Sequence, residues 1–221
     1  MMPLRTKSKL VRRLEALINN PNNKENECRR FLQYVGYLLC KETVIEYHYK
    51  ETNTRITSGN SDYVISGFVE QATGTRSVKA YIWELKAPQC FLFDKDTENR
   101  LIPSRELFQA ENQLLNYFED IKGSERLRAR FGICHPTDIV LGGIIIGCNK
   151  TKVNGDFSNP ETGMKLYVEA ERIRNHYFYN PWGIKLITWD TILDQLSGKS
   201  IKPKITTGPE KARQYPIGRF I

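Results

Sequence analysis

Three residues in one short part of the chain, Asp62, Glu84 and Lys86, have the types that metal-assisted hydrolysis requires. Glu84 and Lys86 lie two apart in an apolar run, and side chains alternate along a strand, so both project from the same face. A hairpin through the sequence ATGT brings Asp62 beside Glu84 on the neighbouring strand. Two carboxylates suit Mg²⁺ or Mn²⁺, which polarises a phosphodiester and activates a bound water, while Lys86 orients that water or offsets developing charge.

The Glu84-x-Lys86 pattern is informative because its strand is expected to lie at the centre of the sheet. A Glu-x-Lys pair on an exposed strand carries almost no information, but a central strand packed by helices makes an ionised group costly unless it is paired or binds metal. Further along, Gln113 and Tyr117 lie one helical turn apart and can reach the same pocket. Alternatively, these two residues form a partly buried polar pair at the edge of the core.

The elements that must position these residues follow an α/β pattern. Apolar residues at helical spacing predict helices over residues 4–18, 24–41, 104–123 and 163–178, with Ser104 as an N-cap, and a short helix from Thr191. Strand patterns occur at TVIEYHYK, DYVISGFVE, SVKAYIWELK, DIVLGGIIIG and IKLITW. The first three form an antiparallel meander, and a crossover helix makes DIVLGGIIIG parallel to its partner. We therefore expect a mixed sheet flanked by helices.

The hairpin between the second and third strands fixes where Asp62 points. Opposed residues of an antiparallel pair face the same way, so Asp62 shares a face with Glu84 only if paired residue numbers have an even sum. A two-residue turn at Thr73 and Gly74 gives an odd sum and would direct Asp62 away, opposite Leu85. We expect an odd-length loop or a bulge in this hairpin.

Composition limits the class of protein. The chain has 221 residues, 40% hydrophobic and 26% charged, which is typical of a globular protein with a real core. A formal net charge of +8 favours a polyanionic partner, although a merely basic surface also accounts for it. Five cysteines without CxxC spacing argue against a disulfide framework and favour a cytoplasmic location. We find no signal peptide and no run apolar enough to span a bilayer, so we expect no membrane association.

The ordered set of Asp62, Glu84-Leu-Lys86 and Gln113-x-x-x-Tyr117 resembles the PD-(D/E)xK nuclease superfamily. Within it, the motifs NSDYVI, WELKAP and AENQLLNY resemble the Shedu anti-phage defence nucleases, over roughly residues 27–196. Ser61 stands where a proline gives the superfamily its name. The resemblance implies an α/β restriction-endonuclease-like fold, a Mg²⁺- or Mn²⁺-dependent deoxyribonuclease, endonuclease in preference to exonuclease, a DNA target, homo-oligomers and a role in phage defence.

The resemblance also implies roles for individual residues. Asp62 and Glu84 would bind the metal with the Leu85 carbonyl, Lys86 would position the attacking water, and Gln113, with Tyr117 on the same helix, would orient Lys86 or that water. An acidic residue of the upstream helix would join the metal site, with Glu27 as the candidate and Glu25 or Glu42 as alternatives. A non-catalytic nucleic-acid-binding or assembly module on the same fold is the rival interpretation.

The ends of the chain and one long connection complete the expectations. Residues 1–23 are expected to form an amphipathic basic helix, residues 24–197 the nuclease domain and residues 198–221 a basic tail. The connection 88–103, directly after Lys86, either touches substrate or caps the core through the sequence CFLF. Phosphate contacts, or alternatively contacts with a protein partner, are expected from the basic residues of both ends: Arg5, Lys9, Arg12, Arg13, Lys199, Lys202 and Lys204.

Overall fold

The computed structural model describes residues 4–40, 44–56, 59–70, 74–157 and 159–198, of which 4–6, 44–56 and 59–61 are described by their main chain alone. Five predicted strand regions form one sheet in the order β1-β2-β3-β6-β8. The first three pair antiparallel, while β6 runs parallel to both β3 and β8. The predicted mixed sheet is confirmed. Its strands are β1 Val44–Ile56, β2 Gly59–Glu70, β3 Arg76–Leu85, β6 Ile139–Ile145 and β8 Lys185–Ile187.

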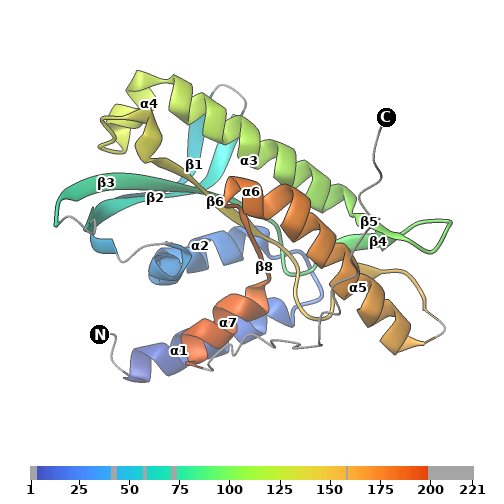
Figure 1. Cartoon of the computed structure of the whole chain (residues 1–221). Helices are drawn as coiled ribbons and strands as arrows, with labels where there is room; N and C mark the ends of the chain where they lie inside the picture. The colour runs from blue at the N-terminus through green and yellow to red at the C-terminus, as the bar shows by residue number, and fades with distance from the viewer. Residues whose placement is uncertain (1–3, 41–43, 57–58, 71–73, 158, 199–221) are drawn as a thin grey trace, which may run out of the picture.

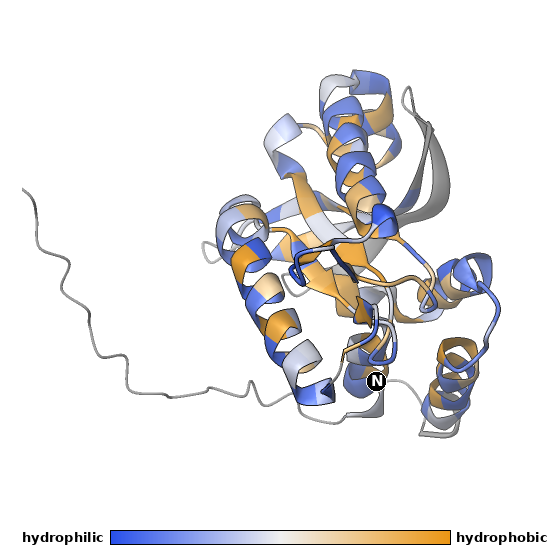
Figure 2. Cartoon of the chain, turned by 90° about the vertical axis from the view of Figure 1, so that its right-hand side faces the viewer, coloured by the Kyte–Doolittle hydropathy of each residue, from blue (hydrophilic) through white to orange (hydrophobic). Residues whose placement is uncertain are grey.

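Helices cover both faces of this sheet (Figure 1). One face carries α3 Arg105–Gly123 and α5 Pro160–Arg174, and the other carries α1 Leu4–Ile18, α2 Glu25–Val35 and α7 Trp189–Ser197. Apolar residues line the sheet and the inward sides of the helices, while polar residues lie outside (Figure 2). The remaining elements are short: η1 Gly36–Leu39, α4 Glu125–Arg130, η2 Pro136–Asp138, the π-helical turn η3 Asn175–Tyr179 and α6 Asn180–Trp182.

The alternation of side chains along β3 divides the interior into two cores. Ile82 belongs to the core under α3, whereas Trp83 and Leu85 belong to the core under α1, α2 and α7. Glu84 and Lys86 therefore project toward α3, opposite to Trp83 and Leu85, as the period of two requires. Leu14 is fully buried in the second core, so α1 packs with the domain that follows it.

Local chemistry accounts for several helix ends. Ser104 is the N-cap of α3, as predicted, because its hydroxyl accepts from the Leu107 N–H at 3.0 Å and donates to the Phe91 carbonyl at 2.6 Å. The predicted helix 24–41 ends earlier, at Val35, and continues as a short 3₁₀ turn. There the Tyr63 hydroxyl donates to the Leu32 carbonyl at 3.0 Å, satisfying an acceptor of the last helical turn.

The connection after Lys86 contains secondary structure of its own. It forms the hairpin β4 Phe93–Lys95 and β5 Leu101–Pro103, and β4 also pairs with β7 Val153–Asn154. Leu92 and Phe93 are buried in the core under α3. The first half of the connection therefore caps the core, which is the second of the two expected roles.

Cys28, Cys90, Cys134 and Cys148 are free thiols. Among the helices of the described residues, none combines the length and hydrophobicity that crossing a membrane would require.

Candidate active site

The register of β2 and β3 brings Asp62 level with Glu84. Glu70 pairs with Arg76, so residues 71–75 form an odd-length connection, and every pair has an even sum up to Tyr63 with Trp83. The next position along the same register is Asp62 opposite Glu84. The expected odd-length loop is confirmed, and both carboxylates lie on the face of the sheet that α3 covers.

Lys86 joins the strand to helix α3. Its ammonium donates to Glu84 Oε1 at 3.0 Å and to Gln113 Oε1 at 2.8 Å. Tyr117, one turn beyond Gln113, is buried. Burial, followed by the Glu84 and Asp62 carboxylates, raises the pKa of the Tyr117 hydroxyl, and hydrogen bonding to Gln113 partly opposes this. The five predicted catalytic residues therefore lie within one cluster.

Asp62 is held by two donors that come from different elements. Its Oδ1 accepts from the Arg29 guanidinium at 2.7 Å, and its Oδ2 accepts from the Leu85 N–H at 3.0 Å. The carbonyl of a strand residue points to the same edge as its N–H, so the Leu85 carbonyl is directed toward the edge of β3 on which β2 lies. Arg29 was not among the residues that the sequence singled out.

Electrostatics favour a protonated Glu84 in the absence of a metal ion. Its side chain is 1% exposed, and this burial, followed by the charge of Asp62, raises the pKa of Glu84 to about 9, although Lys86 opposes the shift. Burial also disfavours the charged form of Lys86, but the neighbouring Glu84 and Asp62 outweigh burial and raise the pKa of Lys86. A divalent cation bound to the Glu84 carboxyl would lower its pKa, and the proton would be released to solvent.

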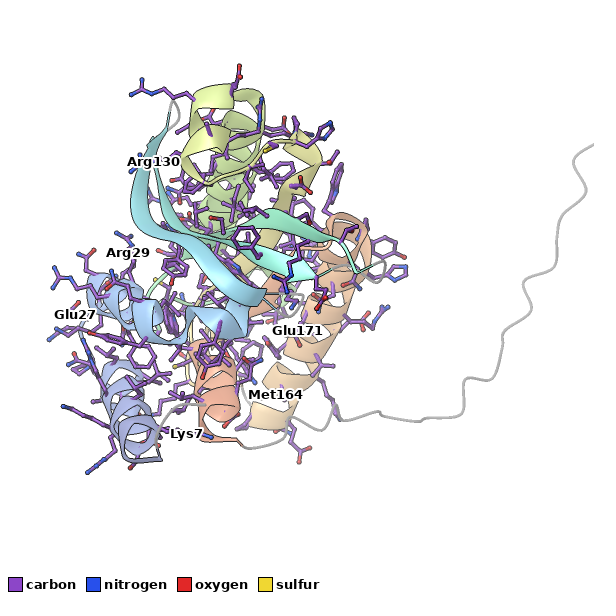
Figure 3. The ribbon with its side chains drawn as sticks, turned by 90° about the vertical axis from the view of Figure 1, so that its left-hand side faces the viewer. Lys7, Glu27, Arg29, Arg130, Met164 and Glu171 are labelled. Atoms are coloured by element: carbon purple, nitrogen blue, oxygen red, sulfur yellow. The ribbon has the colours of Figure 1, made fainter. Side chains whose placement is uncertain are left out.

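The upstream acidic residue that faces the site is Glu25, and not Glu27. Burial raises the pKa of Glu25, while Lys86 lowers it and Asp62 raises it, so Glu25 lies within the electrostatic reach of both. Glu27 instead makes an ion pair with Lys24 at 3.2 Å and is 45% exposed. Figure 3 shows Arg29 on the side of α2 toward the sheet and Glu27 farther out. Glu42 lies outside the described residues.

The donor set fits a hard divalent cation in part. Glu84 Oε2 is buried and accepts from no donor among the described residues, and the Glu84 carboxyl lies within hydrogen-bonding reach of the Asp62 side chain. An orphaned carboxylate oxygen beside a second carboxylate is a place where Mg²⁺ or Mn²⁺ would satisfy both groups. Within the described residues, no group of three or more His, Cys, Asp or Glu is arranged to hold a metal ion. Asp62, Glu84 and the Leu85 carbonyl would therefore be supplemented by water or substrate oxygens.

The main chain at Lys86 is anchored by contacts that the local sequence does not reveal. The Lys86 N–H donates to the Ile145 carbonyl at 2.8 Å, and the Trp189 indole donates to the Lys86 carbonyl at 2.8 Å. A bulge in β6 lies earlier along the same strand pair, between the partners of Ile82 and Trp83. A Cβ at Gly142 would approach Trp83 Nε1 to 2.3 Å, so only glycine leaves room for the indole.

Gln89 ties the start of α2 to the segment that follows Lys86. Its amide donates to the carbonyls of Leu17 and Asn20 at 3.1 and 2.7 Å, and its Oε1 accepts from the Lys24 N–H at 3.3 Å. The helix that carries Glu25 and Arg29 is thereby fixed next to the site strand. The only sequence signal for Arg29 is its spacing of four residues from Glu25, with which it makes an ion pair at 3.2 Å.

The predicted phosphate-binding residues do not join the carboxylate cluster within the described part of the chain. Lys9, Arg12 and Arg13 are exposed on α1, in the layer opposite α3. The Arg13 guanidinium lies 5.5 Å from the centre of the Tyr34 ring. The side chain of Arg5 and the residues Lys199, Lys202 and Lys204 lie outside what the structure describes.

No protein-family model matches the chain, and searches of curated proteins and of solved structures also find no match. Functional inference therefore depends on the chemistry of the cluster around Asp62 and Glu84.

Proposed function

We propose that the chain is a Mg²⁺- or Mn²⁺-dependent endonuclease that hydrolyses DNA phosphodiester bonds on a restriction-endonuclease-like fold. The observation that supports this most is the convergence of five residues from three separate segments. Asp62 comes from β2, Glu84 and Lys86 from the end of β3 and just beyond it, and Gln113 and Tyr117 from α3. The same five residues carry the resemblance to the PD-(D/E)xK superfamily.

Each residue has a role that its surroundings support. Asp62, Glu84 and the Leu85 carbonyl hold the cation, which when bound polarises the phosphodiester and activates a water. Lys86 stays protonated, and its ammonium is oriented by the hydrogen bond that it donates to Gln113 Oε1 at 2.8 Å. It offsets the negative charge that develops in the transition state. The Tyr117 hydroxyl, with its raised pKa, remains a proton donor at neutral pH.

The biological setting follows from the resemblance to Shedu nucleases. On that basis the target is DNA, the protein works in cytoplasmic defence against phage, and it acts as a homo-oligomer. The basic residues of α1, which include the exposed Arg12 and Arg13, supply phosphate contacts outside the site.

Cleavage of supercoiled plasmid by purified protein tests the proposal. Cutting is expected with Mg²⁺ or Mn²⁺ and not with EDTA, and Asp62→Asn is expected to abolish it. Glu119→Gln is a matched control, because Glu119 is an exposed acid on α3, and its ion pair with Lys122, at 3.8 Å, lies outside the carboxylate cluster. Equal cutting by wild type and Asp62→Asn would assign the activity to another site or a contaminant, and would favour a non-catalytic binding module.

A further inference from the structure

Arg29 makes a direct ion pair with Asp62. Its NH2 group lies 2.7 Å from Asp62 Oδ1 and 3.2 Å from Glu25 Oε1, so one guanidinium bridges two carboxylates. The Arg29 side chain is 12% exposed, and that of Asp62 is 10% exposed. A charge-assisted contact this short, between two largely desolvated groups, holds Asp62 firmly.

The oxygen atoms of the two site carboxylates show what a metal ion would have to displace. Asp62 Oδ1 accepts from Arg29, and Asp62 Oδ2 accepts from the Leu85 N–H. Glu84 Oε1 accepts from Lys86, and Glu84 Oε2 accepts from no donor among the described residues. The donor at Oδ2 belongs to a strand backbone and cannot move away. Arg29 is a long side chain on a helix, so it is the donor that a cation can replace.

Arg29 also has a second position to occupy once it leaves Asp62. Glu25 lies one helical turn before it on α2 and already accepts from the same nitrogen. The guanidinium can therefore leave Asp62 and still keep Glu25 as an ionic partner. Such a shift keeps a positive charge near the cation, and that charge opposes binding of the cation.

We propose that Arg29 is a positioning residue that fixes Asp62 in the metal-free protein and competes with the divalent cation for it, thereby lowering the affinity of the site for that cation. The inference rests on the proposed function, because it takes Asp62 and Glu84 as metal ligands. Its consequence is that the site fills only at a higher concentration of Mg²⁺ or Mn²⁺ than its carboxylates alone would require.

Binding of Mn²⁺ alone, without DNA, tests the inference independently of cleavage. Calorimetric titration would compare wild type with Arg29→Gln, which removes the charge but keeps an amide donor, and with Arg29→Lys, which keeps the charge. We expect Arg29→Gln to bind Mn²⁺ about tenfold or more tightly than wild type. Arg29→Lys should stay close to wild type. Arg30→Gln is the matched control, because Arg30 is the exposed next residue of α2, and its variant should bind as wild type does.

The possible outcomes separate the two proposals. In one outcome, Glu84→Gln weakens Mn²⁺ binding relative to wild type, but Arg29→Gln binds Mn²⁺ no more tightly than wild type. Competition by Arg29 is then refuted, and the metal site at Glu84 is supported. If no variant shows Mn²⁺ binding that depends on Glu84, both the inference and the proposed function are overturned.

A measurement on the wild-type protein covers the case in which Arg29→Gln fails to fold. Addition of Mg²⁺ should shift the guanidinium NMR resonance of Arg29, assigned through its loss in Arg29→Lys. Glu84→Gln should suppress that shift at the same Mg²⁺ concentration. An Arg29 resonance that does not respond to Mg²⁺ at concentrations that fill the wild-type site would contradict displacement.

Discussion

Replacing Glu84 with glutamine should change how the stability of the metal-free protein depends on pH. Glutamine keeps the size of the side chain, and its oxygen can accept from Lys86 as Glu84 Oε1 does at 3.0 Å. Its NH₂ group takes the place of Glu84 Oε2, which accepts from no donor among the described residues, and it can donate to the neighbouring Asp62. The variant therefore mimics a permanently protonated Glu84.

The size of the effect follows from the pKa of Glu84, which is raised from 4.5 to about 9 in the folded protein. The proton on Glu84 stabilises the folded protein fully at any pH below the pKa that Glu84 has in the unfolded chain. As the pH rises from that value to and through the pKa in the folded protein, this stabilisation is lost, because the unfolded chain releases the proton first. Between about pH 5 and about pH 8, wild type should lose about 4 kcal/mol of unfolding free energy through this one group. Glu84→Gln should escape that loss.

Urea denaturation in EDTA at several pH values measures the difference in unfolding free energy between the two proteins. The unfolding free energy of Glu84→Gln relative to that of wild type should increase steadily between about pH 5 and about pH 8. Glu27→Gln is the control, because the backbone and Lys24 lower the pKa of exposed Glu27, so its difference from wild type should stay constant above about pH 5. Parallel profiles for Glu84→Gln and wild type would show that Glu84 is ionised in the folded protein, and its burial as an uncharged carboxyl would be refuted.

Further predictions concern catalysis and stability. Lys86→Ala should bind DNA with wild-type affinity in gel shifts but cleave it at least about a hundredfold more slowly, because Lys86 acts mainly on the transition state. Gln113→Ala should slow cleavage only about tenfold, since Lys86 keeps its contact with Glu84. Ca²⁺ should support DNA binding in the same gel shifts with little hydrolysis, because its coordination is larger and looser. Ser104→Ala should lower the unfolding free energy in urea by about 2 kcal/mol, through loss of the cap on Leu107 and of the bond to Phe91.

Features set by local chemistry could be predicted from the sequence. Ser104 caps its helix because a hydroxyl three residues before an amide is enough to do so. The common face of Glu84 and Lys86 follows from the period of a strand, and the odd-length connection follows from requiring Asp62 on that face.

Features set by contacts between distant segments could not be predicted. Glu25 and Arg29 flank one side of the buried stripe of α2 and Glu27 flanks the other, and the sequence does not say which side faces Asp62. The bond from Trp189 to the Lys86 carbonyl joins residues 103 positions apart. At the end of α2, the hydrogen bond to the Leu32 carbonyl likewise comes from another element, through Tyr63.

Single-turnover cleavage of pre-bound DNA is the measurement that tests the central claim most directly. Wild type and Glu84→Gln would each be saturated with the same DNA fragment in EDTA, and an excess of Mn²⁺ would then start the reaction. We predict that both proteins bind the fragment equally and that only wild type cuts it, because Glu84→Gln has lost the charge of a metal ligand. Equal rates of cutting by the two proteins would contradict a metal-dependent nuclease site at Asp62 and Glu84.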